Sequence, residues 1–171
     1  IYWDNLMKNL ISVITCIVIL SIQSTVYAVS VGERAPIFNL TTFESEKRIN
    51  LSDYRGKVIL LDFWASWCTS CRQAFPVLNS FHHQFKAKDF KILAINVDED
   101  PKDGKHFLRR YSADFTVLSD PLAITPEKYQ LKAMPMSFII DRDGIVRKVK
   151  VGFKVTDKIS LYRDIKMMIK E

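Results

Sequence analysis

The sequence predicts a single α/β domain built on a mixed β-sheet, and three observations support this prediction. Apolar segments typical of buried strands alternate with amphipathic segments typical of helices between residues 57 and 118. An Asp-Gly turn at residues 141–144 separates two further apolar segments and predicts a β-hairpin. No repeat or interior linker divides the 171 residues, which are enough for one domain with a substantial core.

The expected strands are short or almost wholly apolar segments, at residues 35–40, 47–51, 57–64, 92–97, 115–118, 137–140 and 145–149. The run at 57–64 is nearly continuous, which is typical of a strand covered on both faces. Alternation of strands and helices predicts parallel pairing in the centre of the sheet. The hairpin adds antiparallel edge strands.

Helices are expected where apolar residues recur at spacings of three and four. One begins at Thr69, with a kink expected at Pro76 because proline removes a backbone donor. A second follows the helix-start signal at 98–101, a short capped helix is expected at 125–130, and a last helix begins at about Thr156. The residues expected to face the core are Phe107, Leu108 and Tyr111 in the second helix and Ile159, Tyr162, Ile165 and Ile169 in the last.

Residues 1–28 are predicted to be a signal peptide or an N-terminal membrane anchor, with residues 29–171 as the folded domain. A short basic start at Met7 marks the expected true start, and residues 26–28 suit a signal peptidase that cuts after Ala28. The apolar stretch Leu10–Ile22 would span about 20 Å as a helix, against about 30 Å of bilayer hydrocarbon, which favours cleavage. In either form the domain is expected outside the cytoplasm, for example in the periplasm.

The three cysteines point to redox chemistry. Cys16 would leave with a cleaved signal, so Cys68 and Cys71 are the cysteines of the mature domain. A structural disulfide usually closes a longer loop, so a redox role explains this Cys-x-x-Cys pair better than a stabilising cross-link does. Cys68 falls where a strand gives way to a helix, whose free N–H groups and dipole stabilise a thiolate. We therefore expect Cys68 to attack a substrate disulfide and the more buried Cys71 to resolve the mixed disulfide.

Two further residues stand out around this pair. Asp62 interrupts the apolar run, and desolvation is expected to raise its pKa toward neutrality, a range useful for moving protons to and from Cys71. A hydrogen-bonded core aspartate that fixes the turn is the alternative. Pro135 begins the strand before the hairpin, and because only about one X-Pro bond in twenty is cis, the residues alone predict a trans bond.

The run from Asp62 to Cys71 resembles a thioredoxin-fold active site, and three companion motifs resemble the exported TlpA-like thiol–disulfide oxidoreductases, which include cytochrome c maturation reductases. The companions are Ala35-Pro36-x-Phe38-x-Leu40, Leu51-Ser52-Asp53-Tyr54-Arg55-Gly56-Lys57, and Met134-Pro135-x-Ser137-Phe138-Ile139-Ile140-Asp141 with Gly144. The resemblance covers about residue 31 to the C-terminus. It implies a thioredoxin-like fold, a central mixed sheet flanked by helices, with an N-terminal β-hairpin and an α/β insertion at 98–131.

The resemblance also implies roles for residues around the cysteines. Pro135 would be a cis-proline that faces the disulfide, and the main chain of Met134 would pair with the bound substrate. The residues expected to contact substrate around the cysteines are Trp67, Thr69 and Ser70. Many TlpA-like proteins carry asparagine where this chain has Asp62.

Departures from the family pattern leave the direction of electron flow open. The dipeptide Thr69-Ser70 lacks the proline usual at its second place, and Ala133 and Met136 replace a glycine and a polar residue. The dipeptide between the cysteines helps to set thiolate stability and thereby the reduction potential.

The leading hypothesis is a protein-disulfide reductase that needs no cofactor beyond the Cys68–Cys71 disulfide and no metal. It would act as a monomer, take electrons from a membrane thiol transporter and reduce apocytochrome c or another exported protein. An oxidase or isomerase is the first alternative. The second is a copper metallochaperone with Cys68 and Cys71 as soft ligands, although His82, His83 and His106 are not obviously placed beside them.

Other classes are disfavoured by what the sequence lacks. A zinc site needs two more Cys or His ligands nearby, and the Thr-x-x-Cys nucleophile of a peroxidase is missing. The composition is ordinary for a soluble globular protein, with 48% hydrophobic and 26% charged residues. The formal charge of +6 comes from scattered basic residues, so we expect no nucleic-acid partner.

Overall fold

The computed structural model describes residue 3 and residues 29–170. The predicted signal peptide or anchor, including the proposed start at Met7, the cleavage site after Ala28 and Cys16, lies outside these described residues. Within the described part, no helix has both the length and the apolar character needed to cross a membrane.

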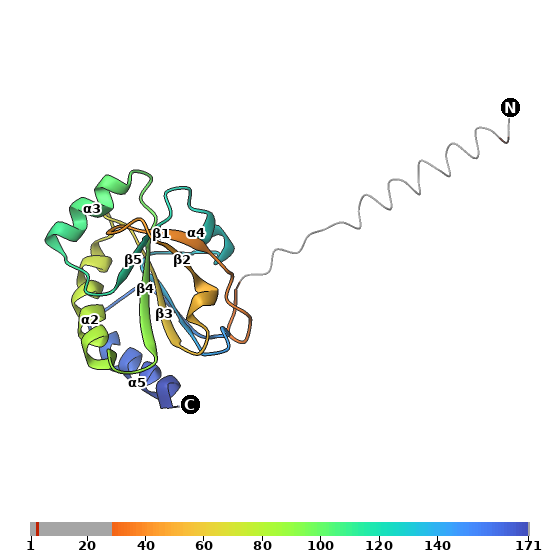
Figure 1. The fold of residues 1–171 in the computed structure, drawn as a ribbon, viewed down its shortest axis with the longest axis vertical. Helices are drawn as coiled ribbons and strands as arrows, with labels where there is room; N and C mark the ends of the chain where they lie inside the picture. The colour runs from red at the N-terminus through yellow and green to blue at the C-terminus, as the bar shows by residue number, and fades with distance from the viewer. Residues whose placement is uncertain (1–2, 4–28, 171) are drawn as a thin grey trace.

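Seven strands of the described chain form one mixed sheet in the order β2-β1-β5-β4-β3-β6-β7 (Figure 1). The strands are β1 (Asn39–Thr42), β2 (Arg48–Asn50), β3 (Val58–Trp64), β4 (Phe90–Asn96), β5 (Thr116–Ser119), β6 (Met136–Ile140) and β7 (Val146–Val151). The three central strands β3, β4 and β5 are parallel, whereas β6 and β7 join beside β3 as an antiparallel hairpin. This arrangement confirms the predicted mixed sheet.

The N-terminal hairpin lies at the opposite edge of the sheet. Its strand β1 pairs antiparallel with β5, with Thr41 opposite Ser119. β1 begins later than expected, because residues 32–35 bond instead to the β6–β7 hairpin, where the N–H of Ala35 donates to the carbonyl of Gly144. The N-terminal segment therefore contacts both edges of the sheet.

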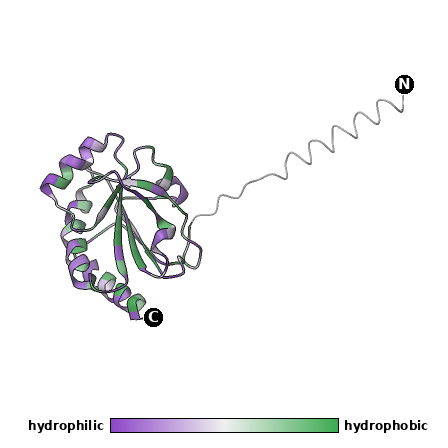
Figure 2. Ribbon diagram, viewed as in Figure 1, coloured by the Kyte–Doolittle hydropathy of each residue, from purple (hydrophilic) through white to green (hydrophobic). Residues whose placement is uncertain are grey.

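Helices cover both faces of the sheet. The helical segments are η1 (Leu51–Tyr54, a 3-10 helix), α2 (Thr69–Phe85), α3 (Pro101–Arg110), α4 (Ile124–Lys128) and α5 (Asp157–Lys170). Side chains of α2, α3 and α5 form one core cluster with one face of the sheet, and the N-terminal segment, η1 and Tyr129 at the end of α4 cover the other. Figure 2 shows the hydrophobic colour concentrated along the central strands, with both colours on the helices, as expected for helices with one buried side.

Two helices differ in detail from the prediction. Ile165 is fully buried as expected, and Tyr162 and Ile169 pack against the same core. Ile159, however, is 70% exposed, and α5 buries Leu161 in its place. The sequence pattern misjudged the phase of this helix in its first turn. α4 is capped from upstream, because the carboxylate of Asp120 accepts the N–H of Thr125 at 2.7 Å.

Candidate active site

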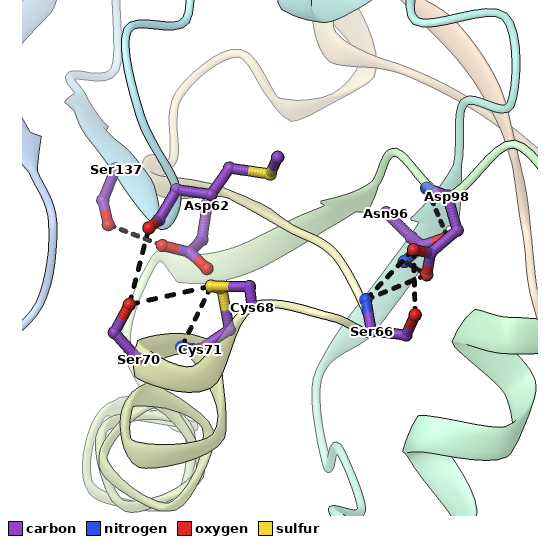
Figure 3. The surroundings of a disulfide bond; sticks show 9 residues. Asp62, Ser66, Cys68, Ser70, Cys71, Asn96, Asp98 and Ser137 are labelled. Atoms are coloured by element: carbon purple, nitrogen blue, oxygen red, sulfur yellow. Dashed lines mark hydrogen bonds between the residues drawn. A yellow bond between two sulfur atoms is a disulfide. The ribbon is translucent and has the colours of Figure 1, made fainter.

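The two cysteines lie where β3 leads into α2, as predicted. Cys68 is the N-cap residue of α2, and its Sγ accepts the backbone N–H of Cys71 at 3.2 Å. The pair forms a disulfide with 5.3 Å between the Cα atoms (Figure 3). Cys71 is fully buried and Cys68 retains a small exposed surface. Of the two sulfur atoms, that of Cys68 is therefore the one placed to meet a second protein.

Asp62 lies on the sheet face that carries the disulfide. Side chains alternate along β3, and the neighbours Leu60 and Trp64 belong to the same core cluster as Cys71. Asp62 therefore points toward the side covered by α2, and Figure 3 shows its carboxyl group with the disulfide and Ser137. The side chain is 1% exposed.

The carboxyl group of Asp62 has few partners. Ser137, its antiparallel neighbour on β6, donates from Oγ to Oδ1 at 2.5 Å. Among the described residues, Oδ2 of Asp62 has no hydrogen-bond partner. Burial raises the pKa of Asp62 to about 7, against the lowering effect of the hydrogen bond from Ser137. The group is thus able to gain and lose a proton near neutral pH.

The peptide bond between Met134 and Pro135 is cis. The trans bond expected from the residues alone is wrong, and the cis bond implied by the family resemblance is present. A statistical preference does not include the tertiary contacts of this loop. The carbonyl of Pro135 accepts the N–H of Gly152 at 2.8 Å, and that of Met134 faces Ser70.

Ser70 links the two sides of the site. Its Oγ lies 3.7 Å from Sγ of Cys68 and donates to the main-chain carbonyl of Met134 at 3.4 Å. Thr69 is exposed, and Trp67 is 65% exposed. The structure therefore brings Ser70 together with Cys68 and Met134, and leaves the flanking Trp67 and Thr69 open to solvent.

Asp98 has a role at the site that the sequence does not predict, because in the sequence it forms part of a helix-start signal. The N-cap of α3 is Asp100, whereas Asp98 is 4% exposed and accepts hydrogen bonds from the backbone N and Oγ of Ser66 at about 3 Å. It also accepts from Nδ2 of Asn96 at 2.7 Å. Asp98 therefore holds the turn that precedes Cys68. The signal was available, because the carboxyl ends of the parallel strands β3 and β4 meet at one edge of the sheet.

His83 and His106 lie in different surroundings. His83 lies on the surface, with Nε2 2.7 Å from Oδ2 of Asp114. His106, which the sequence did not place near the cysteines, lines a groove that Trp67 also lines. Within the part of the chain that the structure describes, no group of three or more His, Cys, Asp or Glu side chains is arranged to hold a metal ion.

Comparison with known proteins identifies the family. The AhpC/TSA family matches residues 31–149. The chain belongs to this family. The thiol-disulfide oxidoreductase ResA of Bacillus cereus (strain ZK / E33L) is 33% identical over 132 residues, which cover 77% of this chain and 76% of the relative. ResA of Bacillus subtilis (strain 168) is 31% identical over 161 residues, covering 92% of this chain and 89% of the relative.

Solved structures agree with this assignment. A crystal structure described as the thiol:disulfide interchange protein DsbE from Chlorobium tepidum has a TM-score of 0.80 and 42% identity, covering 83% of this chain and 99% of that one. With the Cys68–Cys71 pair in place, the chain is a thiol–disulfide oxidoreductase of the ResA and DsbE type with a thioredoxin-like fold.

Proposed function

We propose that the protein is a disulfide reductase that acts outside the cytoplasm on exported proteins, apocytochrome c among them. The observation that carries the proposal is the combination of a fully buried thiol position, Cys71, with the buried carboxyl group of Asp62 on the same face of the sheet. A buried thiol needs a nearby group that removes its proton before it can resolve a mixed disulfide. The names of the ResA and DsbE relatives support the exchange chemistry.

The reaction starts from the reduced form of the pair. The thiolate of Cys68 attacks one sulfur of the substrate disulfide, forming a mixed disulfide and releasing the other substrate sulfur as a thiolate. Cys71 then loses its proton and attacks Sγ of Cys68, which releases the second substrate sulfur. Two electrons have passed to the substrate, and the protein is left with the Cys68–Cys71 disulfide seen in this structure.

Asp62 is proposed as the group that takes the proton from Cys71. Its pKa of about 7 makes both protonation states available near neutral pH. Because Oδ2 has no partner among the described residues, one oxygen of Asp62 is free to receive a proton, directly or through a water molecule. The hydrogen bond from Ser137 holds the other oxygen in place.

Ser70 and the loop at Pro135 are proposed to bind the substrate chain. The carbonyl of Met134 is the acceptor that a substrate N–H would use, and in the oxidised protein Ser70 donates to it. A bound substrate would displace this hydroxyl, which lies close enough to Cys68 to donate to its sulfur instead. The exposed side chains of Trp67 and Thr69 would contact the substrate around the reacting sulfur.

A membrane thiol-electron transporter is proposed to restore the dithiol after each turnover. This donor fits the predicted export of the domain, because soluble cytoplasmic reductants do not reach the periplasm. The proposal needs no cofactor other than the two cysteines.

The direction of transfer is tested with a peptide that contains the haem-attachment pattern Cys-x-x-Cys-His. Equimolar reduced domain and disulfide peptide are mixed, acid-quenched and weighed by mass spectrometry, and oxidised domain is mixed with dithiol peptide in parallel. At equilibrium we expect both mixtures to contain mainly oxidised domain and dithiol peptide, so that the first mixture reacts and the second stays largely unchanged. Accumulation of reduced domain and disulfide peptide would show an oxidase. In C71A, the Cys68 mixed disulfide should accumulate.

A further inference from the structure

A groove of about 320 Å³ lies between the turn that precedes Cys68 and helix α3. One wall comes from the active-site segment, with Trp67 and Arg72, and the other from α3 and its C-terminal end, with Asp103, Phe107, Arg110 and Tyr111. Trp67 directly precedes Cys68, and Arg72 directly follows Cys71. The groove is therefore lined by the sequence neighbours of both cysteines, although neither cysteine lines it and the exchange steps themselves do not use it.

The charges in the groove are mostly positive and unneutralised. Arg72 and Arg110 contribute two positive charges, against one negative charge from Asp103. In the described chain, neither arginine takes part in an ion pair. The guanidinium of Arg110 lies 6.0 Å from the ring centroid of Tyr111. Since neither arginine is engaged in an ion pair with a described residue, both are open to an acidic ligand. A carboxylate can pair with a guanidinium group in a planar, two-point geometry.

The groove also offers apolar surface. Trp67 exposes 65% of its surface, and the largely buried Phe107 lines the opposite wall. Tryptophan, tyrosine and arginine are the residues that most often dominate the binding energy of protein interfaces. All three types line this groove, so its composition is that of a protein-binding surface next to a reactive thiol.

We propose that this groove binds the segment of a protein substrate that flanks its reactive cysteine, and that it selects segments with Asp or Glu beside an apolar residue. The acidic side chain would pair with Arg72 and Arg110, and the apolar one would cover Trp67. This inference rests on the proposed exchange reaction, because the groove selects substrates only if Cys68 attacks them. The formal charge of +6 on the chain attracts the same acidic class over longer distances.

The test compares disulfide peptides that differ at one residue next to the disulfide, which is Glu, Gln or Lys. The reduced domain is mixed with each peptide, and the second-order rate constant is measured at low and at high salt. We expect the Glu peptide to react about tenfold faster than the Lys peptide, because two exposed ion pairs are gained. We expect most of this ratio to be lost in high salt, since exposed charges are screened.

Variants assign the selectivity to the groove. In R72Q/R110Q the ratio of the Glu to the Lys rate constant should fall below about twofold. The matched control K102Q/K105Q removes the same charge from residues of α3 that do not line the groove, and should keep most of the ratio. Taking the ratio within each variant cancels any effect of Arg72 on the reactivity of the neighbouring cysteines. Equal rates for the three peptides, or an equal loss in both double variants, would overturn the inference.

A neutral disulfide separates this inference from the proposed function. Bis(2-hydroxyethyl) disulfide carries no charge and no peptide segment, so the wild type and K102Q/K105Q should reduce it at the same rate. If the reduced wild type fails to reduce it and all three peptides, the proposed function fails. If it reduces all four without charge selectivity, only the assignment of the groove fails.

Discussion

Two buried aspartates flank the active site, and their surroundings differ sharply. Asp98, at the end of β4, accepts hydrogen bonds from three donors, the backbone and side chain of Ser66 and the amide of Asn96. Asp62, in the middle of β3, accepts one from Ser137 and has an oxygen with no partner among the described residues. A carboxylate that accepts several hydrogen bonds holds its donors in place, whereas an oxygen without a partner is free to receive a proton. We infer that Asp98 shapes the site and Asp62 serves its chemistry.

The largest expected effect is on the pH dependence of stability. The folded protein holds the pKa of Asp62 at about 7, above the value of about 3.9 in an unfolded chain. The stability contributed by the protonated form is thus complete below about pH 4 and is lost as the pH rises through 7. The total loss is about 4 kcal/mol, at about 1.4 kcal/mol per pH unit. D62N should abolish it.

The measurement is urea unfolding of the oxidised wild type and of oxidised D62N between pH 5 and pH 9. The difference in free energy of unfolding should grow in favour of D62N by about 1.4 kcal/mol per pH unit between pH 5 and pH 7, and should stay constant above pH 7. Parallel curves over the whole range would contradict a proton-exchanging Asp62.

Removal of the other aspartate, Asp98, should act mainly on stability. D98A leaves the N–H of Ser66 and the amide of Asn96 without their acceptor in a buried region, which we expect to cost on the order of 3 kcal/mol. D100A is the matched control, because within the described chain the side chain of this exposed cap accepts only the N–H of Lys102, and its loss should cost about 1 kcal/mol. Urea midpoints with unchanged slopes give both values. A D98A loss no larger than that of D100A would remove the distinction between the two aspartates.

For the rate of the resolving step, we expect the larger loss on changing Asp62 and the smaller loss on changing Asp98. At pH 7, D62N should slow the resolving attack of Cys71 by about 100-fold, the usual contribution of a general base. Stopped-flow measurement of release of the second substrate thiol, after rapid formation of the mixed disulfide, isolates this step. D98N, which retains a side-chain oxygen acceptor, should slow it less than tenfold. An equal slowing in both variants would indicate that Asp62 acts only through structure.

A smaller shift should follow from loss of the Ser137 hydroxyl. Its hydrogen bond lowers the pKa of Asp62, so S137A should raise the midpoint of the pH–rate profile of resolution by about 1 pH unit. S137T retains the hydroxyl on the same strand position and should restore the wild-type midpoint. A profile that does not move in S137A would exclude this bond as a determinant of the titration.

These predictions also show what the sequence could and could not provide. Cys68, Cys71 and Asp62 could be predicted because each stands out locally. Asp62 is a charged residue inside an apolar strand, and the two cysteines are reactive residues that follow its end. The contact of Ser70 with Met134 joins residues 64 apart in the sequence, and the cis bond before Pro135 departs from the general preference of X-Pro bonds. The role of Asp98 depends on the alignment of two parallel strands, and the exposure of Ile159 on the exact phase of α5, neither of which periodicity specifies.

The smallest expected effect concerns Ser70. Its hydroxyl lies beside the sulfur of Cys68, just as the hydroxyl of Ser137 lies beside the carboxyl group of Asp62. A hydroxyl that donates to the Cys68 thiolate stabilises the reduced form more than its long bond to Met134 stabilises the oxidised form. S70A should therefore move the reduction potential in the negative direction by about 10 to 20 mV. S70T should stay close to the wild type. A shift in the positive direction would mean that the bond to Met134 is the stronger of the two.

The reduction potential of the wild-type Cys68–Cys71 couple tests the central claim most directly. It is measured by equilibrating the domain with glutathione or dithiothreitol buffers of defined potential and counting free thiols by mass spectrometry after alkylation. A reductase with a proton-exchanging Asp62 should have a potential near that of thioredoxin, about −270 mV. A value near −120 mV, typical of a strong disulfide oxidant, would contradict it.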